Sequence, residues 1–172
     1  MPATTNLKPL IDALAETLNR QVAAHEQLAE TLTRQREAMA RGDARLMHGL
    51  AKLQRETLQQ IQTLDQLRAR TAQKLTGFLD PDATEPLRLA ELADRLPEPD
   101  RGRLRVLRTR LTDQVESARR TTAVNHTAAA SLANHVGCIL QNVQHRRSGG
   151  SAYAPSGRSA ALRVPGGLSL SA

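Results

Sequence analysis

The residues that could bind a metal or act as a nucleophile are five histidines and one cysteine, Cys138. His135 and Cys138 are three positions apart, a spacing that puts both side chains on one face of a helix. A zinc site needs four ligands, or three and a water, and a Cys–His nucleophile needs a third, orienting group. The sequence has no second cysteine to complete a metal site. We therefore predict no metal, no cofactor and no catalytic residue, and a protein that is not an enzyme.

Nucleic acid is the next candidate ligand, because five arginines lie close together between residues 101 and 110. Arg101, Arg105 and Arg108 share a helix face and could neutralise phosphates. The alternative is a solvated helix face whose arginines pair with acids such as Asp94. No recognition motif and no stacking aromatics accompany the cluster, so we favour the second interpretation and expect no nucleic-acid partner.

Composition points to a helical protein of the cytoplasm. The 172 residues suit one domain, and the apolar residues are mainly Leu and Ala, with Phe78 and Tyr153 as the only aromatics. A lone cysteine excludes an internal disulfide and suits a reducing compartment. No apolar run is long enough to span a bilayer, and the N-terminus lacks the layout of a signal peptide. We expect a cytoplasmic protein without membrane insertion.

Apolar residues recur every three or four positions over most of the chain, which indicates amphipathic helices. Gly42-Asp43 predicts the end of one helix followed by the N-cap of the next, and Pro81, Pro86, Pro97 and Pro99 mark further helix boundaries. The alternative is one continuous helix through Gly42. The predicted helices are Thr5 or Asn6 to about Arg41, Ala44 to about Leu79, Leu87–Leu96, and 98–145.

The predicted fold is therefore all-α: an elongated, coiled-coil-like antiparallel bundle of three long helices and one short helix. Residues 1–147 form the bundle domain in this prediction. Residues 148–172 are rich in Gly, Ser and Pro, and we expect a disordered tail. From Arg146 to the end, the chain carries four arginines and no acidic residue. Residues 1–145 therefore hold only +3 of the formal net charge of +7.

The last long helix is the most informative because its stripe of apolar or small residues runs almost its whole length. Asn125 falls on this stripe, where a polar side chain can fix register; the alternative is that it faces solvent. Beyond it the stripe returns to bulky residues. If these are exposed, they form a face suited to binding another helix, and if they pack on the hairpin they are core. They are Leu132, Val136, Ile139, Leu140 and Val143.

Four segments, in this order, resemble the FlgN family of flagellar type III export chaperones. Residues 36–43 (REAMARGD) are similar to the family's junction before its second helix, and residues 50–70 to its leucine-spaced helix that ends in Arg. Residues 122–125 (Thr-x-x-Asn) are similar to the place where the family tends to carry Asn before its last amphipathic segment, although no second Asn follows Asn125 at the family's usual spacing. Residues 151–158 (SAYAPSGR) are similar to its terminal Tyr-Gly element, with Ala154 in place of Gly.

The resemblance implies a cytoplasmic helical chaperone that uses no cofactor. It would bind the terminal segments of hook-associated flagellar proteins, prevent their premature assembly and deliver them to the export gate of the type III apparatus. On this interpretation Leu132, Val136, Ile139, Leu140 and Val143 bind the client, and Asn125 is a register-setting contact. Tyr153 would contact either the client or the export gate, with an inert tail residue as the alternative.

Two other functions remain open at this point. One is a structural or adaptor coiled coil that self-associates through the stripe, and a homodimer is also compatible with the chaperone hypothesis. The other is a nucleic-acid-associated basic helical protein, which would show steep salt dependence.

Overall fold

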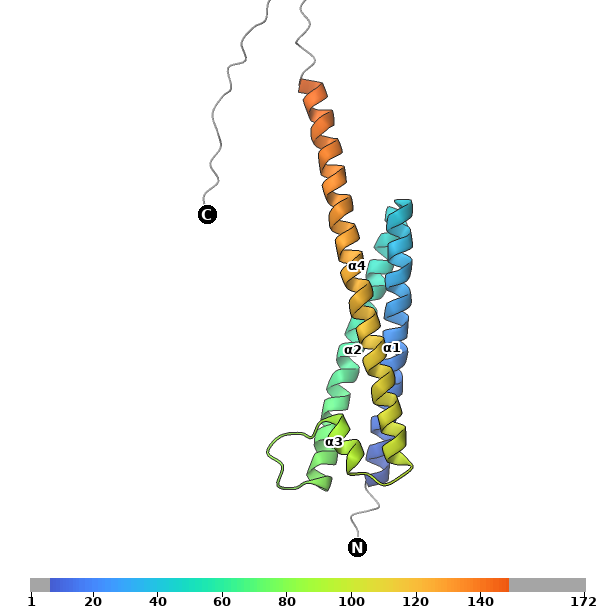
Figure 1. Ribbon diagram of the computed structural model, residues 1–172, viewed down its shortest axis with the longest axis vertical. Coiled ribbons are helices and arrows are strands. Elements are labelled where there is room, and N and C mark those ends of the chain that lie inside the picture. Colours follow the sequence, from blue (N-terminus) through green and yellow to red (C-terminus); the bar gives the residue numbers. More distant parts are fainter. Residues whose placement is uncertain (1–6, 149–172) are drawn as a thin grey trace, which may run out of the picture. The chain divides into compact units, whose positions relative to one another are not determined.

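The computed structural model describes residues 7–148, and the side chains of residues 7–145. These residues form four helices and no strand: α1 (Leu7–Arg41), α2 (Ala44–Leu79), α3 (Leu89–Asp94) and α4 (Asp100–Ser148) (Figure 1). The prediction of three long helices and one short helix is confirmed. The short helix is smaller than the predicted Leu87–Leu96, because Arg88 is still extended, with φ −67° and ψ 153°. The predicted tail lies outside the described residues.

The turn between α1 and α2 follows from two adjacent residues. Gly42 has φ +65°, a left-handed conformation that glycine adopts without steric cost. The Gly42 and Asp43 amides donate to the carbonyls of Met39 (3.1 Å) and Ala38 (3.0 Å) and so close α1. Asp43 then caps α2 by accepting a hydrogen bond from the Leu46 amide at 2.9 Å. The two helices are therefore separate, and the continuous-helix alternative is wrong.

Side-chain pairs define the directions of the helices. Gln21 donates to Asp65 and Gln35 donates to Gln54, so α2 runs antiparallel to α1. Towards α4, Lys8 pairs with Asp100 at 2.7 Å, and Asn125 bonds to Leu32. Residue numbers rise together in these last two pairs. The part of α4 up to Ser131 is thus parallel to α1 and antiparallel to α2.

The core consists almost entirely of Leu, Ile and Ala and forms two clusters. The first lies where α3 packs against α1, α2 and the start of α4, and the second lies further along the same helices. Aliphatic side chains without aromatic rings let neighbouring helices pack closely, so the core of the bundle is thin. The first cluster contains Ile11, Leu14, Ala15, Leu18, Leu75, Leu92, Ala93, Leu96, Leu104 and Leu107. The second contains Ala24, Leu28, Leu32, Ile61, Leu64 and Ala118.

The stripe of α4 is buried along only part of its length. Leu104, Leu107, Ala118 and Asn125 are buried, and every described residue from His126 to His145 is exposed except the partly exposed Gly137. The chain divides into two compact units near this change, Met1–Ser131 and Leu132–Ala172. One continuous sequence pattern therefore serves two different environments.

This division predicts that truncating a side chain destabilises the protein in the first half of the stripe and has little effect in the second. Leu104 is fully buried, so Leu104→Ala should lower the free energy of unfolding by about 2–5 kcal/mol. Val136 is 45% exposed, and Val136→Ala should change it by less than about 0.5 kcal/mol. Urea unfolding followed by circular dichroism measures both. Equal losses for the two variants would show that the stripe is core throughout.

Candidate protein-binding surfaces

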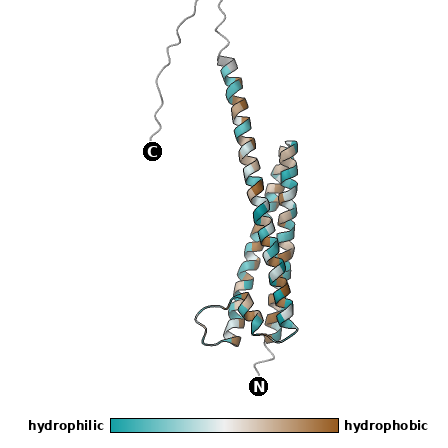
Figure 2. Cartoon of the chain, viewed as in Figure 1, coloured by the Kyte–Doolittle hydropathy of each residue, from teal (hydrophilic) through white to brown (hydrophobic). Residues whose placement is uncertain are grey.

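Five large aliphatic residues near the end of α4 are exposed together. Leu132, Val136, Ile139, Leu140 and Val143, which we call the apolar α4 face, are each 41–56% exposed. Their spacing of four, three, one and three positions keeps them on one side of the helix. Residues 121–145 contain no Asp, Glu, Lys or Arg. Figure 2 shows apolar positions recurring along this part of α4. A contiguous exposed apolar face of this kind is typical of protein-interaction sites.

Asn125 takes the first of its two predicted positions, on the packed stripe. It is 8% exposed, and its Nδ2 donates to the Leu32 carbonyl oxygen at 2.7 Å. A directional bond at one point of an otherwise aliphatic contact favours a single register of α4 on α1. Its Oδ1 is buried without a hydrogen-bond partner among the described residues. Contact between Asn125 and a client stays a prediction, and Tyr153 lies outside the described residues.

The arginine cluster is engaged largely within the protein. Four of its five members make hydrogen bonds or ion pairs, which supports the interpretation as a solvated face that also ties the start of α4 to its neighbours. The contacts are Arg101 Nε with the Leu96 carbonyl (3.0 Å), Arg103 with Asp12 (2.8 Å), Arg105 with Asp94 (2.6 Å) and Arg110 with Glu26 (3.6 Å).

His135 and Cys138 are both exposed on α4, and Cys138 is a free thiol. Within residues 7–148, no group of three or more His, Cys, Asp or Glu side chains is arranged to hold a metal ion. The structure therefore adds no further ligand to this pair.

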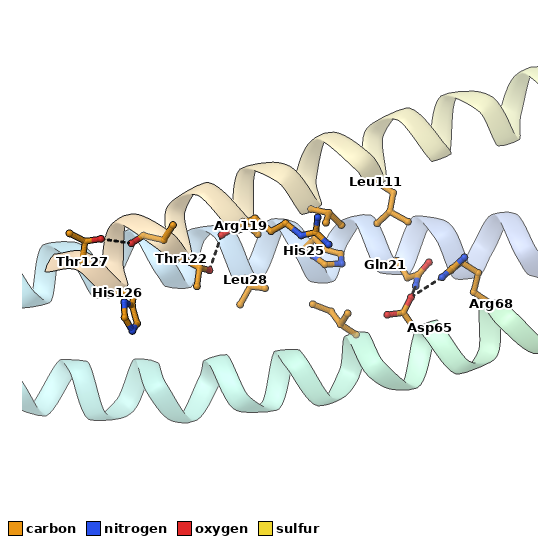
Figure 3. A pocket seen from close by; sticks show the side chains of 14 residues that line it. Gln21, His25, Leu28, Asp65, Arg68, Leu111, Arg119, Thr122, His126 and Thr127 are labelled. Atoms are coloured by element: carbon orange, nitrogen blue, oxygen red, sulfur yellow. Dashed lines mark hydrogen bonds and ion pairs between the residues drawn. The ribbon is translucent and has the colours of Figure 1, made fainter. Parts of the chain in front are cut away.

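A second candidate surface is a groove within the first unit, between α2 and α4 with α1 as its floor (Figure 3). Its volume is about 960 Å³. The groove residues are Gln21, His25 and Leu28 of α1, Ile61, Asp65 and Arg68 of α2, and Leu111, Val115, Ala118, Arg119, Thr122, Ala123, His126 and Thr127 of α4. Such a lining combines an aliphatic floor with several polar and charged groups.

A short polar network joins α1 to α2 within the groove. Gln21 Nε2 donates to Asp65 Oδ1 at 2.7 Å, and Arg68 Nη2 donates to the same oxygen at 3.2 Å (Figure 3). Three buried polar atoms in the groove have no hydrogen-bond partner among the described residues: Gln21 Oε1, His25 Nδ1 and Arg68 Nε. Buried polar atoms in proteins are normally paired, so this concentration marks the groove as unusual.

Of the groove residues, His25 is partly buried on α1. Sequence reasoning did not identify Gln21, Asp65, Arg68 or Arg119 as members of a site. Only the burial of Gln21 could have been inferred from the sequence, because Gln21 lies three residues after Leu18 and four before His25, on the buried side of α1.

The structure thus defines a class: a helical-bundle protein with exposed surfaces suited to binding other proteins. Within the described residues, no helix is long and apolar enough to cross a membrane. The family model described as FlgN protein matches residues 1–161. The chain therefore belongs to the FlgN family, which indicates a flagellar export chaperone. No significant match was found among curated proteins or solved structures.

Burial in the groove makes a prediction about pH. Burial lowers the pKa of His25 below its ordinary value of 6.5, and the charge of Asp65 opposes this only in part. Below pH 6.5 the unfolded chain therefore binds more protons at this residue than the folded protein does. The free energy of unfolding should fall as the pH drops through this range. His25→Gln should show a shallower fall in urea unfolding measured across it, and an unchanged slope would contradict the assignment.

Proposed function

We propose that this protein is a cytoplasmic chaperone that binds the terminal segments of hook-associated proteins through the apolar α4 face. In this proposal it prevents their premature assembly and delivers them to the export gate of the type III apparatus. Membership of the FlgN family supports the chaperone class. The observation that carries the binding site is the exposure of five large aliphatic side chains on one uncharged stretch of helix.

The chemistry of the face suits an amphipathic helix as its ligand. A client segment that forms helical contacts only after assembly has an apolar face of its own, and burying two such faces against each other removes both from water. Binding of this kind needs no nucleotide and no cofactor. Because residues 121–145 carry no charged side chain, affinity should depend little on salt.

Asn125 and Tyr153 have separate places in this proposal. Asn125 holds α4 in one register on α1 through its Nδ2 and so determines where the apolar α4 face begins. Its buried Oδ1, which has no partner among the described residues, is the atom left for a direct client contact. Tyr153 is proposed to contact either the client or the export gate.

The proposal predicts that a charge on the apolar α4 face abolishes client binding. The complex with the terminal segments of the hook-associated proteins from the same genome should be lost in Val136→Asp and in Ile139→Asp. A carboxylate cannot be buried in an apolar contact without a partner. Truncating one anchor to Ala should cost about 1–3 kcal/mol of binding. Co-purification followed by light scattering measures the complex and its stoichiometry.

Matched controls lie on the same helix. Val106 is 60% exposed on α4 but lies outside the apolar α4 face, so Val106→Asp should leave the complex intact, as should Arg105→Ala. A stable homo-oligomer that forms without client and is lost in Val136→Asp would instead assign the face to self-association. Salt-sensitive binding of duplex DNA would support the nucleic-acid alternative.

A further inference from the structure

The groove between α2 and α4 is as long as a helix of about four to five turns. On α4 its lining extends from Leu111 to Thr127, which is about 24 Å at 1.5 Å per residue. Three helices that surround such a channel leave a position that a fourth helix can occupy, as in four-helix bundles. The groove lies within Met1–Ser131 and shares no residue with the apolar α4 face.

The groove also contains hydrogen-bonding groups that the described chain does not use. Gln21 is only 1% exposed, yet its Oε1 has no partner. The Nε of Arg68 is buried without a partner as well. Arg119 is exposed, and within the described residues it makes no ion pair, unlike the neighbouring Arg120, which pairs with Glu116 at 3.9 Å.

The charge of the groove is unbalanced. Asp65 is its only carboxylate, and it already accepts hydrogen bonds from Gln21 and Arg68. Within residues 7–145 Arg119 makes no ion pair, and His25 and His126 add imidazoles to the same lining. A ligand with acidic side chains beside an aliphatic surface would match both the excess positive charge and the aliphatic part of the lining, which includes Leu28, Ile61 and Val115.

Two occupants from this chain are disfavoured by their composition. Residues 149–172 contain no Asp or Glu, so their side chains offer no carboxylate to Arg119. The apolar α4 face of a second copy lies within residues 121–148, which also contain no Asp or Glu. A partner helix with acidic side chains would supply the charge that these two segments lack.

We propose that the groove binds an acidic amphipathic helix of a partner protein, which completes a four-helix bundle with α1, α2 and α4. Its aliphatic residues lie on the floor of the groove, a carboxylate pairs with Arg119, and a donor reaches Gln21 Oε1. This is a binding site additional to the apolar α4 face, and it does not depend on the identity of the export client.

The test uses the full chain and two synthetic helical peptides, each about 18 residues long to match the groove. Both carry Leu at i, i+3, i+4 and i+7 spacing; one has Glu beside the Leu stripe, and the other has Lys at the same positions. Fluorescence anisotropy of the labelled peptides measures binding. We expect the Glu peptide to bind at least about tenfold more tightly than the Lys peptide. An about tenfold rise in salt should reduce this difference.

Two pairs of variants locate the site. Arg119→Glu should weaken the Glu peptide at least about tenfold, and Arg120→Glu, at the next position but outside the groove, should not. Ala123→Trp places a bulky ring in the groove and should block binding, whereas Ala128→Trp, on the same helix outside this groove, should not. Both alanines are exposed, so the variants should keep the fold, which circular dichroism checks.

Several results would overturn the proposal. These are no saturable binding of the Glu peptide, equal affinities for the two peptides, or equal effects of Arg119→Glu and Arg120→Glu. Loss of peptide binding in Val136→Asp would assign the peptide to the apolar α4 face instead. Failure of the proposed export function remains distinguishable, because it would appear as loss of client binding while the peptide still binds the groove.

Discussion

Leu104, Leu107 and Ala118 bury one side of α4 against the α1–α2 hairpin, and the other features of the protein depend on this packing. The contact itself is aliphatic and contains no directional bond. The bond from Asn125 to the Leu32 carbonyl and the ion pair from Lys8 to Asp100 bind α4 at two distant points. Together they determine which residues of α4 are covered and which remain exposed.

The two proposed surfaces differ in their chemistry because they arise from different relations between the helices. The apolar α4 face belongs to one helix and lies within residues 121–145, which contain no Asp, Glu, Lys or Arg. The groove requires three helices and combines an aliphatic floor with Asp65, Arg68 and Arg119. The first surface should select ligands mainly by apolar area, and the second by charge as well. One small bundle could therefore bind two partners without competition.

Much of the fold could be predicted from the sequence because local signals coincide with the helix ends. Gly42 and Asp43 provide a left-handed stop and an N-cap in succession, and the prolines bracket α3. The point where the α4 stripe loses its cover could not be predicted, since Leu107 and Leu132 have the same periodicity and differ only in their tertiary environment. The groove was hidden for a related reason: Gln21, Asp65 and Arg119 lie on three helices, and only their packing brings them together.

Hydrogen exchange along α4 tests most directly whether the stripe changes from core to binding surface beyond Asn125. It would be measured for the full chain, alone and with a terminal segment of a hook-associated protein. Free of client, amides of residues 104–125 should exchange slowly and those of residues 132–145 rapidly. The client should slow residues 132–145 at least about tenfold, the protection expected of a helix held in a complex. Slow exchange along all of α4 without client, or a complex that leaves residues 132–145 unprotected, would contradict the account.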